Sequence, residues 1–182
     1  MKKMFETERT VLRPWEPSDA DAYYKLVSDT VVCDSAGSCT VKDVIESKKF
    51  IDEVLIPRGC NAIELKESCE VIGNIALLTT CYSNVFNAFS GREIAFSLSQ
   101  PNWGKGLMKE ILDCLLKYGF NDLKLDFISC AHFEDNERCR NLINNFSFCP
   151  AFSAPSNFTR SNGTEPIEII NILTKDRYLK AK

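Results

Sequence analysis

Two glycines placed two residues apart, Gly104 and Gly106, lie between an alternating apolar segment and an amphipathic one. The pattern predicts a strand at 92–98 and a helix at 107–118, joined by the turn Trp103–Met108. The free N–H groups and the dipole of a helix N-terminus favour an anion, and glycine lets the backbone approach it closely. We therefore predict an anion-binding turn. It matches neither a Walker A loop nor a Gly-x-Gly-x-x-Gly dinucleotide turn.

Glu93 is the residue on the preceding strand that could transfer protons. Strand alternation places it on the face opposite the apolar Ile94, Phe96 and Leu98. A carboxylate within a covered sheet is costly unless it is paired or faces a wet cleft. Burial would raise the pKa of Glu93 toward the working pH. The alternative is a structural salt bridge, for example with Arg92.

The cysteines and the single histidine, His132, predict no metal centre. The nine cysteines are odd in number, scattered, and contain no Cys-x-x-Cys pair. We expect reduced thiols rather than a disulfide framework, with Cys114 and Cys130 as small core residues in apolar runs. Three roles are open for His132: a second base, a residue that lines the acceptor channel, or a structural hydrogen bonder.

The composition is that of an ordinary globular protein of 182 residues, with 45% hydrophobic and 26% charged residues. A formal charge of −3 argues against direct binding to nucleic acid, which favours a basic face. No apolar run reaches the roughly 18 residues that a membrane helix needs. The N-terminus shows no signal-peptide pattern, so we expect a cytoplasmic protein that does not engage membranes.

The elements that must position these residues alternate between periods of two and about 3.6. We expect strands at 10–15, 62–66, 71–78, 92–98, 127–131, 148–152 and 167–173, and helices at 22–27, 41–55, 107–118 and 136–146. We expect Ser18 and Thr40 to begin the first two helices as capping residues. The segment 29–39 has no clear assignment, and 79–91 and 154–166 are expected to be loops, the latter long and mobile. The order predicts a single α+β domain over 1–182, with a mixed, mostly antiparallel sheet and helices on both faces.

This order of elements, with these residues, resembles the GNAT superfamily of acyl-CoA-dependent N-acetyltransferases. The resemblance covers roughly residues 5–152, and is closest to the branch that acetylates the N-termini of ribosomal proteins. It rests on four stretches: Thr7–Trp15, Glu70–Ile75, Arg92–Leu98 followed by Trp103–Met108, and Asn136–Ile143 followed by Phe148.

The resemblance implies splayed central strands that hold acetyl-CoA as cosubstrate, and direct attack of a primary amine on its thioester. Glu93 would be the general base, and Cys139 would protonate the departing thiolate or pack against the CoA arm. The residues implied in CoA binding are Phe96, Ser97, Leu98, Trp103, Gly104, Lys105, Gly106, Leu107, Met108, Asn136, Arg138 and Cys139.

Four residues depart from the family pattern. Ala95 stands where a strand glycine is common before the aromatic residue. Pro101 stands where Gln or Arg is usual, Cys139 where this branch tends to have Ser, and Ser147 where a glycine is usual. Serine would be strained at 147 if that position requires a positive φ.

Two alternatives remain open beside an N-terminal acetyltransferase: a non-catalytic acyl-CoA-binding or sensing protein, and an acetyltransferase for a polyamine or aminoglycoside. The second would need an acidic acceptor pocket, for which Glu64, Glu67, Glu70 and Glu93 are candidates. The acceptor would be selected by the variable segments 32–39, 79–91 and 154–166. A monomer and a homodimer are both compatible with the sequence.

Overall fold

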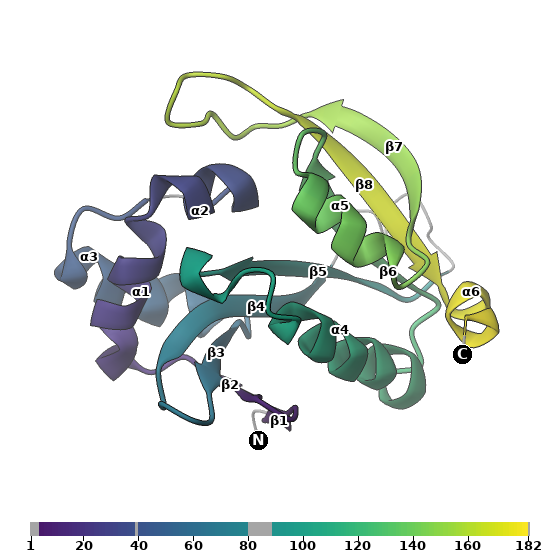
Figure 1. Ribbon diagram of the computed structural model, residues 1–182, viewed down its shortest axis with the longest axis horizontal. Coiled ribbons are helices and arrows are strands. Elements are labelled where there is room, and N and C mark those ends of the chain that lie inside the picture. The colour runs from purple at the N-terminus through teal and green to yellow at the C-terminus, as the bar shows by residue number, and fades with distance from the viewer. Residues whose placement is uncertain (1–3, 39, 80–88, 182) are drawn as a thin grey trace. The chain divides into compact units, whose positions relative to one another are not determined.

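A computed structural model describes residues 4–38, 40–79 and 89–181 of the chain. Its eight strands follow the sheet order β1-β2-β3-β4-β5-β6-β8-β7 (Figure 1). The strands are β1 (Phe5–Glu6), β2 (Thr10–Pro14), β3 (Asn61–Leu65), β4 (Val71–Thr79), β5 (Gly91–Leu98), β6 (Phe127–Phe133), β7 (Cys149–Pro155) and β8 (Ile167–Thr174). The helices are α1 (Ala20–Val27), α2 (Thr30–Ala36), α3 (Val44–Phe50), α4 (Leu107–Lys117), α5 (Glu137–Asn144) and α6 (Lys175–Lys180). This is the predicted mixed α+β fold.

The chain forms two compact units. The first comprises Met1–Ala76 and Phe96–Cys114, and the second Leu77–Ala95 and Leu115–Lys182. Strands β4 and β5 and helix α4 each pass from one unit into the other.

In the first unit, antiparallel ladders join β1 to β2, β2 to β3 and β3 to β4. Ala62 and Ile63 are consecutive in β3 and both are fully buried. Successive strand residues face opposite sides, so both faces of the sheet are covered. Trp15 is 2% exposed, meets Tyr23 of α1 edge-on, and donates from Nε1 to Asn74 Oδ1 at 2.8 Å.

In the second unit, β6 is the central strand. Its parallel ladder with β5 has three pairs and ends at Glu93 opposite Ser129, whereas its antiparallel ladder with β8 runs from Phe127 to Phe133. The last residue of β5 that pairs with β6 is Glu93. The end of the ladder at this point agrees with the prediction that these two central strands splay apart. Strand β7 completes this side by pairing antiparallel with β8.

Several predicted helix boundaries were wrong. The unassigned segment 29–39 contains α2, because Asp29 accepts hydrogen bonds from the N–H groups of Val31 and Val32 and Gly37 ends the helix with φ 63°. The second predicted helix begins at Val44, with Asp43 rather than Thr40 as its cap. Ser18 lies inside the 3₁₀ turn Pro17–Asp19, so it is not a helix cap. In both places a nearby aspartate accepts a backbone hydrogen bond, Asp19 from the N–H of Glu16 and Asp43 from the N–H of Glu46.

The predicted mobile loop 154–166 is shorter than expected and is held by specific contacts. β7 continues to Pro155, and Arg160 makes two 2.7 Å hydrogen bonds to Asp135. The ring of Phe158 stacks on that of Phe133, with 6.0 Å between centroids. The other predicted loop, 79–91, is shortened by β4 and β5, and residues 80–88 lie outside the described residues.

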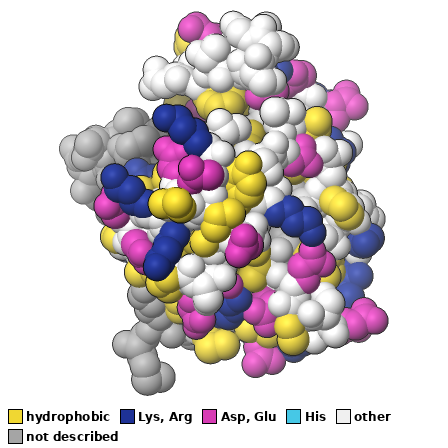
Figure 2. All heavy atoms as spheres, turned by 90° about the vertical axis from the view of Figure 1, so that its left-hand side faces the viewer, with side chains coloured by type: hydrophobic (Ala, Val, Ile, Leu, Met, Phe, Trp, Pro, Cys, Tyr) yellow, Lys and Arg dark blue, Asp and Glu magenta, His cyan; other side chains and the backbone are white. Residues whose placement is uncertain are grey.

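Acidic and basic side chains are interspersed on the face displayed in Figure 2. Across the described parts of the chain, no helix is long and apolar enough to cross a membrane. In the same residues, no group of three or more His, Cys, Asp or Glu side chains could hold a metal ion.

Candidate active site

The glycine turn of the first unit has the backbone geometry of a helix-start anion site. Gly104 and Gly106 adopt φ of 72° and 79°, a region that residues with a Cβ rarely occupy. Helix α4 begins at Leu107, and the carbonyl oxygen of Gly106 accepts from the N–H groups of Lys109 (3.1 Å) and Glu110 (3.3 Å). The N–H groups of the first helical turn precede these bonds and have no intrahelical acceptor.

The space beside this turn suits a bulky anion. Gly104, Lys105 and Gly106 are exposed, and a Cβ added to Gly104 would meet no atom within 4 Å. Gly104 is therefore required for its left-handed conformation, and the room on its outer side is open. These residues fit the diphosphate of a nucleotide cofactor such as CoA.

Pro101 does not disturb the turn. It lies in the 3₁₀ helix Gln100–Asn102, whose first positions tolerate a residue without an N–H donor. Trp103 follows, donating from its backbone N to Gln100 O (3.0 Å) and from Nε1 to Leu98 O (2.6 Å). These bonds connect the turn to the end of the strand that carries the predicted residues Phe96, Ser97 and Leu98. The strand end and the turn belong to the same unit.

In the second unit, Glu93 has the properties expected of a general base. Its side chain is half-buried, and burial, followed by the negative charge of Glu168, raises its pKa above the ordinary value of 4.5. Among the described residues Glu93 makes no salt bridge with Arg92, whose Nη1 donates to Gly91 O at 3.4 Å.

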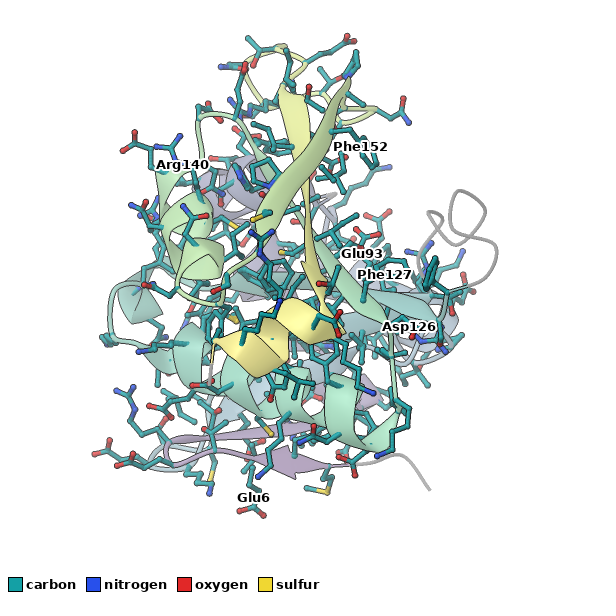
Figure 3. The ribbon with its side chains drawn as sticks, turned by 90° about the vertical axis from the view of Figure 1, so that its right-hand side faces the viewer. Glu6, Glu93, Asp126, Phe127, Arg140 and Phe152 are labelled. Carbon is teal, nitrogen blue, oxygen red and sulfur yellow. The ribbon has the colours of Figure 1, made fainter. Side chains whose placement is uncertain are left out.

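Glu168 is a second carboxylate that the sequence-based reasoning missed. Glu93 is paired with Ser129, and Phe133, four residues further along β6, is paired with Glu168 of β8. Alternation along β6 puts both glutamates on one face of the sheet (Glu93 is labelled in Figure 3). Burial also raises the pKa of Glu168. The sequence feature that could have identified Glu168 is the presence of a charged residue in the apolar segment 167–173.

Cys139 and Asn136 lie together at the start of α5. The side chain of Asn136 accepts from the N–H of Cys139 at 3.0 Å, which confirms the predicted helix cap. The thiol of Cys130 is fully buried, and its pKa is raised first by a hydrogen bond with Cys139 and then by burial. Cys130 follows Ser129, so it points to the sheet face opposite Glu93. Arg138, the remaining predicted CoA contact here, is exposed.

Two other residues have structural explanations. His132 is buried, and its Nδ1 lies 2.8 Å from the carbonyl oxygen of Phe133. A carbonyl only accepts, so Nδ1 carries the proton, in agreement with a structural hydrogen bond. Ser147 has φ 64°, the left-handed conformation that made a serine costly at this position.

The predicted site residues thus fall into two groups. The first unit holds the strand end 96–98 and the turn 103–108, and the second holds Glu93, Asn136, Arg138 and Cys139.

Comparison with known proteins identifies the family. Residues 9–148 match the family described as Acetyltransferase (GNAT) domain. The chain belongs to the GNAT acetyltransferase family. A Bacillus licheniformis protein named Uncharacterized N-acetyltransferase p20 is 32% identical over 148 residues, covering 78% of this chain and 80% of that protein.

Solved structures support the fold of this GNAT chain. A GNAT-family acetyltransferase from Bacillus anthracis has a TM-score of 0.80 and 17% identity, covering 96% of this chain and 99% of that one. The ribosomal-protein-S5-alanine acetyltransferase from Vibrio fischeri has a TM-score of 0.76 and 17% identity, covering 97% and 98%. At such identities the likeness concerns the fold alone.

Proposed function

We propose that this GNAT protein transfers an acetyl group from acetyl-CoA directly to a primary amine, with a protein or peptide N-terminus as the favoured acceptor. The observation that carries the proposal is the turn at Gly104 and Gly106, whose left-handed glycines precede the N-terminus of the eleven-residue helix α4. In an acetyltransferase family member, the anion that suits this turn is the pyrophosphate of CoA.

The residues proposed to hold CoA have distinct tasks. Backbone N–H groups from Gly104 to Met108 would bind the pyrophosphate, with Lys105 close enough in sequence to add charge. The backbone of Phe96–Leu98 would orient the thioester and donate to its carbonyl oxygen. The remaining proposed contacts are Trp103, Asn136, Arg138 and Cys139.

Acetyl-CoA supplies an activated thioester when it is bound. Glu93 would accept a proton from the ammonium of the acceptor, directly or through water, and leave a neutral amine. The amine nitrogen would form a bond to the thioester carbonyl carbon, and the carbon–sulfur bond would break. The thiol of Cys139 would donate a proton to the departing sulfur. The nitrogen would lose its second proton to water, and water would return a proton to Cys139. No bond between acetyl group and enzyme forms, so no cysteine nucleophile is required.

The N-terminal acceptor is supported by the sequence resemblance to the ribosomal-protein branch. One solved structure with a similar fold is named ribosomal-protein-S5-alanine acetyltransferase. A second candidate, a polyamine, is favoured by Glu93 and Glu168, two half-buried carboxylates on one sheet face. A cytoplasmic location and a monomer or homodimer stay predictions.

Turnover measurements with Glu93→Gln test the proposal. The wild type should release CoA when given acetyl-CoA and an N-terminal peptide or spermidine, and the variant should lose about 10²- to 10⁴-fold in kcat at neutral pH. Asp176→Asn is the matched control, since Asp176 is exposed in the same unit and lies outside the segments expected to select the acceptor. CoA binding without turnover of any amine in a broad panel would favour the sensing protein instead.

A further inference from the structure

Arg9 lies beside the glycine turn, although it comes from the distant turn between β1 and β2. Its Nε donates to Glu110 Oε1 at 2.6 Å, and its Nη2 contacts the same oxygen. A Cβ added to Gly106 would lie 3.4 Å from Arg9 Nη2. Glu110 follows Gly106 by four residues and so lies on the same side of α4. The guanidinium of Arg9 therefore lies close to both Gly106 and Glu110.

The position of Arg9 is set by an ordered hairpin turn. Thr10 N donates to Thr7 Oγ1 at 3.0 Å, and Thr7 N donates to Thr10 O at 2.9 Å. The carbonyl oxygen of Arg9 accepts from the N–H of Lys66 at 3.0 Å. The side chain of Arg9 is 44% exposed, but its backbone is held from both sides.

Glu110 presents an electrostatic problem for the proposed CoA site. Burial acts to raise its pKa, but the hydrogen bond and charge of Arg9 outweigh burial, so the pKa is lowered and the carboxylate is ionised at neutral pH. An ionised carboxylate in the first turn of α4 suits the helix dipole, yet it repels a pyrophosphate at the same helix end.

We propose that Arg9 is a positioning residue for CoA, which acts by neutralising Glu110 beside the pyrophosphate turn. The inference rests on the proposed function, since it assumes that the anion at Gly104–Met108 is the CoA pyrophosphate. Arg9 does not need to touch the cofactor. Its charge cancels the field of Glu110, while the backbone N–H groups make the contacts.

A charge-removal cycle distinguishes this role from a purely structural clamp. The dissociation constant of CoA is measured by titration calorimetry at about 50 mM salt for the wild type, Arg9→Gln, Glu110→Gln and the double variant. Arg9→Gln should weaken CoA binding about 3- to 10-fold, because Glu110 is left uncompensated. Glu110→Gln should bind CoA as well as the wild type or better, and the double variant should recover most of the loss.

The opposite pattern overturns the proposal. If the pair is only a clamp, both single variants weaken CoA binding and the double variant does not recover it. Lys49→Gln and Glu53→Gln are matched controls, because that exposed i,i+4 pair lies in the same unit away from the turn. They should leave the dissociation constant unchanged.

Three further measurements test whether the loss of CoA affinity in Arg9→Gln is electrostatic and arises at the pyrophosphate. The loss should be smaller at about 0.5 M salt, where exposed charges are screened. The same loss should be seen with 3′-dephospho-CoA, because this ligand retains the pyrophosphate. If the loss were absent with 3′-dephospho-CoA, Glu110 would not act on the pyrophosphate. If Arg9→Gln does not fold, Arg9→Lys, which keeps the charge, should bind CoA nearly as the wild type does, and a large loss would argue for the clamp.

Failure of the broader proposal gives a different result. A wild-type protein that does not bind CoA overturns the proposed function together with this role of Arg9. A wild-type protein that binds CoA, with Arg9→Gln binding it equally well, overturns only the role of Arg9.

Discussion

At the scale of single residues, the two glutamates of the second unit show how burial sets protonation. Glu93 and Glu168 lie on one sheet face, are half-buried, and have raised pKa values. Arg160 lies over the ring of Phe133 in β6 and makes two 2.7 Å hydrogen bonds to Asp135. A proton or a cationic acceptor would relieve the remaining negative charge.

The raised pKa of Glu93 predicts a pH-dependent stability. Between the unfolded value near 4.5 and the raised folded value, the folded state binds more protons than the unfolded state. Stability should therefore fall as pH rises through this window. Glu93→Gln should make the fall smaller and give a higher Tm than the wild type at pH 7.5, measured by thermal unfolding between pH 4.5 and 7.5. An unchanged profile, equal to that of the exposed control Asp176→Asn, would contradict the prediction.

At the scale of elements, the close approach of β4 and β5 depends on a glycine. A Cβ added to Gly73 would collide with the carbonyl oxygen of Ser97, and would lie 3.0 Å from Leu98 Cδ1 and 3.1 Å from Ile63 Cδ1. Ser99 N donates to Ile72 O at 2.8 Å beside this point. The end of β5, which leads into the glycine turn, is thus packed directly on β4.

Gly73→Ala should therefore destabilise the protein by about 1–3 kcal/mol, because backbone must move to admit the methyl group. Urea unfolding measures the loss. Gly59→Ala is the comparison, since Gly59 has φ 71° and open space around it, so that substitution costs only backbone strain of about 1–2 kcal/mol. A Gly73→Ala variant as stable as the wild type would show that β4 and β5 can separate at no cost.

At the scale of the whole molecule, the division into two units does not fall between complete elements. The boundaries at Ala76, Ala95 and Cys114 interrupt β4, β5 and α4. Neither unit contains a complete set of strands and helices from a continuous piece of chain. We therefore propose that residues 1–182 form a single folding domain, as the sequence predicts.

Thermal unfolding should then be one cooperative transition. The calorimetric and van't Hoff enthalpies should agree, and circular dichroism and tryptophan fluorescence should report the same midpoint. Trp15 and Trp103 both belong to the first unit, so fluorescence follows that unit. Two separated midpoints would show that the units unfold independently.

Features that depend on nearby residues could be predicted from the sequence. The turn at Gly104–Gly106 and the cap at Asn136 are local, because a left-handed glycine and a side-chain cap involve residues only a few positions apart. The misplaced helix starts at Ser18 and Thr40 were also local, but there a competing aspartate formed the hydrogen bond. The strain at Ser147 was expected from the resemblance, in which a glycine is usual at this position, and its φ of 64° agrees with that expectation.

The sequence by itself determined most of the order of strands and helices, except β1, α2 and α6, together with the glycine turn. Alternation and turn chemistry depend on residues a few positions apart, so a short stretch of sequence is enough to recognise them. Only the tertiary structure decided which charges meet. Arg9 and Glu110 are 101 residues apart, and Glu168 reaches the face of Glu93 through the register of β6 and β8. Such pairs depend on strand register and on packing of distant segments, which no local pattern specifies.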